Sequence, residues 1–410
     1  AKRACSGASL SSLTCIAENR MKLIFRAICA VLFGYAVSAR YGGPIDGLLP
    51  EETRSQQIRA EGSSETIPEL QTLAEAISLS HHLESVSVYI GTAEKEIFSY
   101  YKNQNAPRKD EPMPVASASK WVTGYVLLSL VEDGLLSLDT YPSSLLNFWP
   151  SDGLFGQVTL KQLLSFTSGF LYANRTQLAC PADASGNFNV THCAKDIFDR
   201  YSRFPKEPGT IFGYSNEHLE LASALVESVT GRLWTEVFNE RVVDKLGLSP
   251  QTGFPFFSTA GGLEISARDY IKFMTGCLMK SQADCLQEET LEAMNVDYTA
   301  EVPEVEFSRT FPGWFPLWPN WHYGLAHWIE CPESYPFWSE SCTNSSQTGV
   351  HSSIGALGFY PIIDFRRREG LDGPIYIVIA PKPEGDRLME KSLALSNDLR
   401  RAFDKAFPLI

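Results

Sequence analysis

The chain has 410 residues, of which 44% are hydrophobic and 20% charged, a composition typical of folded globular proteins rather than disordered ones. Its formal net charge of −13 argues against nucleic acid or acidic lipid as a binding partner. At this length the chain holds one large domain or two to three small ones, and its sequence contains no internal repeat or low-complexity tract.

A secretory leader is predicted over residues 21–39. Met21 is followed by two early basic residues, an apolar run and small residues that end at Ala39, the expected cleavage position. Residues 1–20 are interpreted as an over-extended reading frame. Because the apolar run of about 15 residues is short for a bilayer span, secretion or residence in the secretory lumen is favoured over a membrane anchor. No stable membrane insertion is expected after cleavage.

Cysteines and glycosylation sequons in the remaining chain agree with export. Six cysteines lie after the leader, in pairs that are close together along the chain. Six cysteines allow fifteen connectivities, and this spacing favours three local disulfides. The expected pairs are Cys180–Cys193, Cys277–Cys285 and Cys331–Cys342. Three N-x-S/T sequons, each beside one of these cysteine loops, predict glycosylated surface positions. Their acceptors are Asn174, Asn189 and Asn344.

A linker precedes the predicted folded domain. Residues 40–65 are rich in glycine, proline and charge, so the domain is expected over residues 66–410. Apolar residues at helical spacing predict a helix over 66–83, and alternation on both sides of a turn predicts a β-hairpin over 85–103. The next predicted helix, 117–131, is apolar nearly all round and should be buried on most faces.

The rest of the domain is mostly helical until strands return near its end. Residues 135–260 carry helical patterns separated by proline and glycine loops. Paired strands are predicted at 355–364 and 373–382, followed by an amphipathic helix over 386–407. We therefore expect an α+β sandwich, in which an antiparallel sheet built from both ends of the domain is flanked by the N- and C-terminal helices. A mostly helical insertion is expected at about residues 121–260.

A Ser-x-x-Lys motif begins the predicted buried helix, within "VASASKWVTGYVLL" at residues 115–128. Ser117 and Lys120 are three residues apart, so at helical spacing their side chains share a face and can touch. A second copy, Ser99 to Lys102, lies in a strand-like stretch where such positions point to opposite faces. The motif alone does not distinguish a nucleophile with its base from two polar residues at the start of a core helix.

A Tyr-x-Asn motif provides the second candidate site. The chain holds three copies, beginning at Tyr101, Tyr172 and Tyr214. Only Tyr214-Ser-Asn216 follows a Pro-Gly turn and precedes a long helical pattern, which is the context expected of a functional motif.

Five segments together resemble the serine β-lactamase and DD-peptidase superfamily, in its class C β-lactamase-related branch, from about residue 85 to the C-terminus. They occur in the family's order and approximate spacing. The segments are "ASASKWVTGYVLLSLVEDGLLSLDT", "VTLKQLLSFTSGF", "EPGTIFGYSN", "AGGLEISARDYIKFM" and "HYGLAHWIE".

The resemblance implies a nucleophile and its proton carriers. Ser117 would attack an acyl group, and Lys120 could lose its proton because burial disfavours an ammonium ion. Tyr214, kept partly as a phenolate by cationic neighbours, would take the Ser117 proton or protonate the leaving group. Which of Lys120 and Tyr214 is the acylation base stays open. Asn216 would orient Lys120 or the substrate amide.

The third family motif departs from its usual form. The family places Lys-Thr-Gly or His-x-Gly on the strand that edges the active site, and the best counterpart here is His351-Ser352-Ser353. Ser353 stands in place of the glycine, and its Cβ should narrow the cleft where a substrate backbone would approach. The oxyanion is expected to bind the backbone N–H of Ser117 and a second one near Ser353 or Ile354.

These features lead to an expected function. A histidine is mostly neutral at pH 7 and anchors a carboxylate less well than a lysine. We therefore expect a secreted esterase or amidase that acts on neutral or weakly polar acyl groups, with β-lactam hydrolysis slow or absent. The alternative is a secreted binding protein that keeps the fold with little or no catalysis. The expected partner is a small-molecule or peptide-like acyl substrate. No cofactor or metal is expected, because the histidine spacings match no common ligand pattern.

Overall fold

The structure is a computed structural model that describes most of the chain beyond residue 67. The described residues are 68–79, 83–170, 189–201, 206–255, 258–280, 285–306, 321–330 and 349–410. The chain divides into two compact units, 1–55 and 56–410, and every described residue belongs to the second. The predicted leader and linker, with Asn174, Asn344, Cys180, Cys331 and Cys342, lie outside the described residues.

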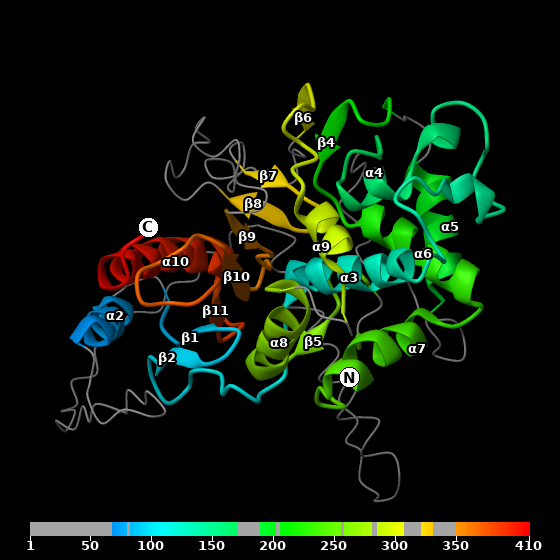
Figure 1. Ribbon diagram of the computed structural model, residues 1–410. Coiled ribbons are helices and arrows are strands. Elements are labelled where there is room, and N and C mark those ends of the chain that lie inside the picture. Colours follow the sequence, from blue (N-terminus) through cyan, green and yellow to red (C-terminus); the bar gives the residue numbers. More distant parts are fainter. Residues whose placement is uncertain are drawn as a thin grey trace, which may run out of the picture. The chain divides into compact units, whose positions relative to one another are not determined.

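Within the described residues, both ends of the chain build one seven-stranded antiparallel sheet. Its strand order is β2-β1-β11-β10-β9-β8-β7 (Figure 1). The strands are β1 (Val86–Thr92), β2 (Glu96–Tyr101), β7 (His322–Tyr323), β8 (Trp328–Glu330), β9 (Val350–Ser352), β10 (Tyr360–Asp364) and β11 (Ile375–Pro381). The predicted N-terminal hairpin and the predicted pair of C-terminal strands are both present, and β1 pairs with β11 along its whole length. This confirms the α+β class with a sheet built from both ends.

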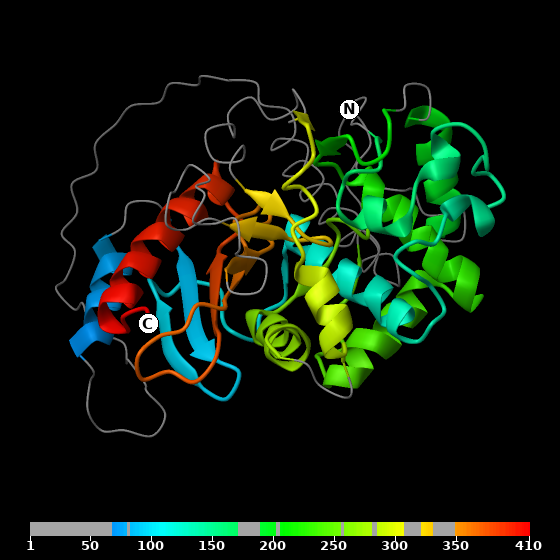
Figure 2. The same cartoon turned by 45° about the horizontal axis from the view of Figure 1, so that its top comes forward.

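Two helices from opposite ends of the described chain flank this sheet. Helix α2 (Pro68–Leu79) and helix α10 (Leu388–Ala406) lie side by side, and the sheet lies between this pair and helices α3 and α8 (Figure 2). Leu395, Leu399 and Phe403 are buried on α10, and their spacing of four residues places them on one face. The amphipathic C-terminal helix predicted over 386–407 is therefore present as α10.

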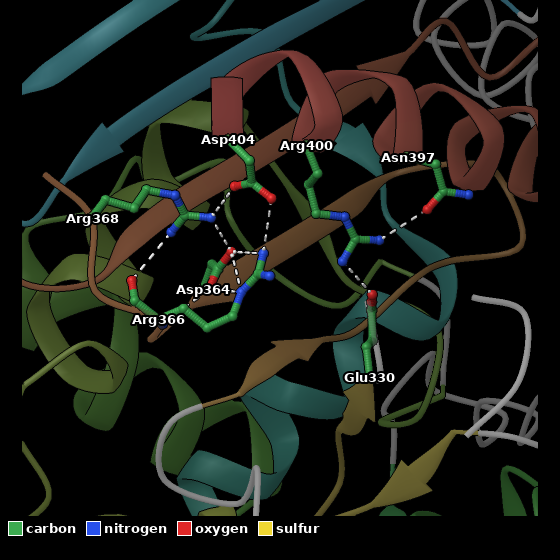
Figure 3. A network of polar contacts seen from close by, with 7 residues as sticks. All are labelled: Glu330, Asp364, Arg366, Arg368, Asn397, Arg400 and Asp404. Atoms are coloured by element: carbon green, nitrogen blue, oxygen red, sulfur yellow. Dashed lines mark hydrogen bonds and ion pairs between the residues drawn. The ribbon is translucent and has the colours of Figure 1, made fainter. Parts of the chain in front are cut away.

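A buried polar network connects α10 to the strands beneath it (Figure 3). Arg400 of α10 donates to Glu330 of β8 across 2.8 Å, and Arg368 bridges Asp364 of β10 and Asp404 of α10 at 2.5 and 2.8 Å. Because a buried charge needs an opposite charge close by, these pairs set where the helix can dock on the sheet.

Helices dominate the part of the chain between β2 and β7. The α-helices there are α3 (Ser119–Glu132), α4 (Leu160–Leu164), α5 (Val190–Tyr201), α6 (Glu217–Thr230), α7 (Trp234–Phe238), α8 (Ala267–Phe273) and α9 (Glu288–Asn295). Short 3-10 turns are η1 (Ala116–Ala118), η2 (Pro142–Ser144) and η3 (Phe155–Gln157), and π-helical turns are η4 (Asn239–Asp244) and η5 (Met274–Leu278). Two small sheets pair β3 (Met113–Pro114) with β5 (Glu264–Ile265) and β4 (Ile211–Gly213) with β6 (Glu304–Glu306). Within the described ranges, no helix combines the length and apolar character needed to cross a bilayer.

Helix α3 passes through the core, as its apolar sequence predicts. Residues 119–130 are all buried. Gly124 allows this close packing, because a Cβ at that position would lie 2.6 Å from the Cβ of Ala326. The prediction that the helix begins at Ser117 is wrong by two residues: Ser117 lies in η1, and the α-helix starts at Ser119.

The described cysteines and the described sequon can be placed. Cys277 and Cys285 form the local disulfide that the sequence predicts. Cys193 is also disulfide-bonded, while its expected partner Cys180 lies outside the described residues. Asn189 is exposed just before α5, and its Oδ1 accepts a hydrogen bond from the backbone N–H of His192 at 2.6 Å.

Candidate active site

The backbone before Ser117 is held in a strained conformation. Ala116 has φ +48°, a left-handed value that is unusual for a residue with a side chain. The Val115 N–H donates to the Leu263 carbonyl at 3.1 Å, and a Cβ on Gly355 would come within 2.0 Å of the Val115 carbonyl oxygen. Only glycine therefore fits at position 355, and the turn that presents the half-buried Ser117 is fixed from two sides.

Lys120 is the centre of the candidate site. Its side chain is 1% exposed, and its Nζ lies 3.1 Å from Ser117 Oγ, 2.7 Å from Asn216 Oδ1 and 2.8 Å from the Ala260 carbonyl oxygen. An ammonium group would donate to all three, whereas a neutral amine would donate to two and accept from the Ser117 hydroxyl. The sequence prediction that Ser117 and Lys120 touch is therefore met, and α6 brings Asn216 to them.

Burial brings the amine of Lys120 close to the state a base requires. It lowers the pKa of Lys120 to about 7, although the carboxylates of Glu220 and Glu217 act in the opposite direction. Near neutral pH a substantial fraction of the molecules would therefore hold Lys120 as a free amine, able to accept the proton of Ser117.

Tyr214 lies between β4 and α6 and interacts with both Ser117 and Lys120. Burial raises the pKa of Tyr214 well above its usual value, and hydrogen bonds with the side chains of Ser117 and Trp328 only partly offset this. Lys120 Nζ lies 5.1 Å from the centre of the Tyr214 ring. The expectation that Tyr214 is partly a phenolate is corrected, because the desolvation that lowers the pKa of Lys120 also disfavours a phenolate beside it.

Trp328 supports Tyr214 and is absent from the residues that sequence reasoning selected. The two rings stack with centroids 4.9 Å apart and planes 25° apart, and the Phe166 ring also packs against Tyr214, with centroids 5.4 Å apart. The available signal was the position of Trp328 in "HYGLAHWIE", a segment selected for its resemblance and not for a side-chain role.

His351 is placed on β9 and held by a second histidine. It is fully buried, and its Nδ1 lies 2.8 Å from Nε2 of His327, whose own Nδ1 lies 3.1 Å from the Leu325 carbonyl oxygen. Burial lowers the pKa of His327, as does the neighbouring His351, so His327 is neutral. It must then donate from Nδ1 to Leu325 and accept at Nε2, which requires His351 to donate from Nδ1.

The two histidines also stack on helix α3. The ring of His327 lies between Trp121 of α3 and His351, at centroid distances of 5.1 and 5.0 Å. Sequence reasoning weighed the histidine spacings only for metal binding and missed this contact of His327. The signal for it lies in the pairing of β8 with β9, which a single sequence does not reveal.

Ser353 contacts the backbone of Ser117. Its hydroxyl donates to the Ser117 carbonyl oxygen at 3.1 Å, and its own N–H donates to the Pro361 carbonyl at 3.2 Å. The second oxyanion donor was expected to be the amide of Ser353 or of Ile354. The Ser353 N–H already donates to β10 and is therefore not available for an oxyanion. This leaves the amide of Ile354, the other position that the sequence indicates, as the candidate.

Comparisons with known proteins identify the family of the chain. The family model named Beta-lactamase matches residues 64–328, a range that ends before the third motif at 351–353. A lovastatin esterase of Penicillium rubens is 29% identical over 187 residues, which cover 40% of this chain and 44% of the relative. A D-aminopeptidase of Brucella anthropi is 27% identical over 139 residues, covering 34% of this chain and 26% of the relative. The chain thus spans less than half the length of either curated relative.

Solved structures share the fold at low sequence identity. The D-amino acid amidase of Ochrobactrum anthropi superposes with a TM-score of 0.58 at 18% identity, over 82% of this chain and 99% of that one. The hydrolase EstCE1, which has promiscuous acyltransferase activity, gives a TM-score of 0.59 at 17% identity, over 82% and 97%. The family match covers well over half of the residues, and the chain belongs to the beta-lactamase family.

Proposed function

We propose that this protein is a serine acyl hydrolase that forms an acyl-enzyme on Ser117. The observation that carries the proposal is the buried amine of Lys120, 3.1 Å from Ser117 Oγ, with a pKa lowered by burial to about 7. A serine hydroxyl needs such a base to become a nucleophile, and burying a lysine amine is costly unless the group has a task.

The proposed acylation step assigns one task to each group. Neutral Lys120 accepts the hydroxyl proton as Ser117 Oγ bonds to the acyl carbon, and the carbonyl oxygen becomes an oxyanion. The N–H groups of Ser117 and Ile354 stabilise that charge. The oxyanion then collapses, the bond to the leaving group breaks, and Tyr214, protonated in the resting site, gives its proton to the leaving oxygen or nitrogen. The Lys120 ammonium restores the tyrosine proton, and water later hydrolyses the acyl-enzyme.

We further propose that the substrate carries a neutral or weakly polar acyl group, most simply as an ester. Support comes from the third motif, where a neutral His327 fixes His351 with Nδ1 as its donor. His351 is itself fully buried, so this position of β9 offers no exposed lysine-like cation to anchor a substrate carboxylate. The lovastatin esterase match agrees with this choice. We expect β-lactam hydrolysis to be slow or absent.

Passage through the secretory pathway is part of the proposal. The leader pattern at 21–39, the Cys277–Cys285 disulfide and the exposed sequon acceptor Asn189 support it, because disulfides and N-glycans belong to that compartment. N-terminal sequencing of protein secreted from a eukaryotic host tests the cleavage site, and a chain that stays attached to membranes would contradict it.

Intact-mass analysis after exposure to a fluorophosphonate, and separately to a penicillin, tests the catalytic proposal. We expect the wild type to gain one fluorophosphonate adduct and Ser117→Ala to gain none. A persistent penicillin adduct would move the substrate toward β-lactams or D-amino-acid peptides. A folded wild type that reacts with neither probe would contradict the proposal and leave the binding-protein alternative.

A further inference from the structure

Glu220 is a buried carboxyl group that the proposed acylation step does not use. It lies on α6 four residues after Asn216 and is 2% exposed. Its two oxygens accept four hydrogen bonds from three consecutive residues. The donors are Ser258 Oγ at 2.6 Å, the Thr259 N–H at 3.1 Å, Thr259 Oγ1 at 2.9 Å and the Ala260 N–H at 3.3 Å. One side chain thus fixes the whole segment 258–260.

The same segment ends on Lys120. The carbonyl of Ala260 is one of the three groups within hydrogen-bond distance of Lys120 Nζ, at 2.8 Å. The carbonyl of Thr259 accepts from Thr123 Oγ1 at 2.5 Å, one turn further along α3. The segment is therefore held between α6 on one side and α3 on the other. On the α6 side, the Glu220 carboxyl oxygens accept from all three residues, and Ser223 Oγ donates to Thr259 Oγ1 at 3.0 Å.

We propose that Glu220 is a positioning residue for Lys120, which it controls through the segment 258–260. By holding that segment, it keeps the Ala260 carbonyl against Nζ and so aims the amine at Ser117. This inference rests on the proposed function, since it takes Lys120 to be the acylation base.

Charge gives the second part of the same role. Among the described residues, the titratable groups facing Lys120 are Tyr214 and, on α6, Glu217, His218 and Glu220. Burial raises the pKa of Glu220, but its four hydrogen bonds oppose this and favour the carboxylate. A carboxylate stabilises the ammonium form of Lys120, so its removal lowers the pH at which the free amine appears.

The chain contains a matched control on the same helix. Glu227 also accepts hydrogen bonds from neighbouring segments. Its donors are the N–H groups of Val190, Thr191 and Trp234 and the hydroxyl of Thr191. These contacts hold α5 and α7 rather than the 258–260 segment. Glu227→Gln therefore weakens a comparable set of hydrogen bonds between α6 and its neighbours but leaves the contacts of Lys120 unchanged.

The experiment measures the second-order rate of Ser117 labelling by a fluorophosphonate in the full chain between pH 5 and 9. The rate should rise with pH as Lys120 loses its proton, and the midpoint of this rise, called the acid limb, is expected near pH 7. For Glu220→Gln we expect the acid limb to move down by about one pH unit, with the rate at its plateau reduced about tenfold. Glu227→Gln should leave both the limb and the plateau unchanged. Thermal melting of each variant checks that the proteins are folded.

Ser258→Ala provides a second, milder variant, since it removes one hydrogen bond to Glu220 and keeps the charge. We expect it to slow labelling without moving the acid limb. If Glu220→Gln does not fold, an unchanged rate in Ser258→Ala would overturn the inference. If Glu220→Gln folds, a pH profile with the same midpoint and the same plateau rate as that of Glu227→Gln would overturn the inference. Failure of the wild type to label would instead refute the proposed function, so the two failures are distinguishable.

Discussion

The hydroxyl of Ser353 donates a hydrogen bond to the backbone carbonyl of Ser117 across 3.1 Å. The residue that replaces the expected glycine of the third motif therefore braces the turn that carries the nucleophile. Ala116, the residue before Ser117, has a left-handed φ of +48°, so this turn depends on contacts from outside itself to keep its conformation.

This contact predicts different results for two substitutions of Ser353. Ser353→Ala keeps the Cβ and should lose about 1 kcal/mol of unfolding free energy, the usual contribution of one hydrogen bond. Ser353→Gly loses the same bond and also opens the cleft beside the nucleophile. We expect only the glycine variant to be acylated by penicillin faster than the wild type. Intact-mass time courses measure this, and equal rates in both variants would show that the Cβ does not limit access.

The pKa of Lys120 predicts the pH dependence of acylation. Only the free amine can accept the Ser117 proton, so the labelling rate should rise with pH through a midpoint near 7, where burial places the pKa of Lys120. Lys120→Arg keeps a permanent cation and should reduce the rate at least about a thousandfold at every pH. Stopped-flow labelling across the pH range checks both results. A rate that rises only near pH 10 would assign the base to a group with an ordinary pKa.

Tyr214→Phe separates the two roles that the sequence leaves open for this tyrosine. Burial raises the pKa of Tyr214 and keeps it protonated, so we assign it to the leaving group rather than to Ser117. Loss of the phenol should slow hydrolysis of an alkyl ester by about 10²- to 10³-fold. Hydrolysis of a nitrophenyl ester, whose leaving group needs no proton, should fall much less. Equal losses for both esters would indicate instead that Tyr214 is the base.

The buried ion pair between Glu330 and Arg400 predicts a stability effect far from the chemistry. The two side chains are 1% and 6% exposed and lie 2.8 Å apart. Arg400→Met leaves the Glu330 carboxylate buried without its partner and should lower the unfolding free energy by about 3–5 kcal/mol. The double variant Glu330→Gln with Arg400→Met should be less destabilised than the single one. Urea unfolding of the double variant and of each single variant measures these losses. A double-variant loss equal to the sum of the two single losses would contradict a direct pair.

Acid should weaken the same network through Asp364. Burial alone would raise the pKa of Asp364, but the guanidinium groups of Arg366 and Arg368 hold it below its usual range. A carboxylate with a lowered folded-state pKa contributes stability above its unfolded value, near 4, and loses that contribution as the pH falls further. Unfolding by urea at pH 6 and pH 3 should therefore differ less in Asp364→Asn than in the wild type.

Local patterns in the sequence were sufficient for several elements. The alternation over 85–103 predicted the β1–β2 hairpin, and the almost wholly apolar run after Lys120 predicted a buried helix, because both signals arise from backbone periods of a few residues. The i, i+3 spacing of Ser117 and Lys120 likewise predicted their contact, although a 3-10 turn carries the serine.

The chemistry of the site was decided by segments far apart along the chain. Asn216 and Ala260 reach Lys120 from 96 and 140 residues away, and the pairing of β8 with β9 brings His327 to His351. Sequence by itself supplied the residue types and their order. Only the tertiary structure decided their protonation, since the pKa of Lys120 or Tyr214 depends on how completely distant segments exclude water and which charges they bring close.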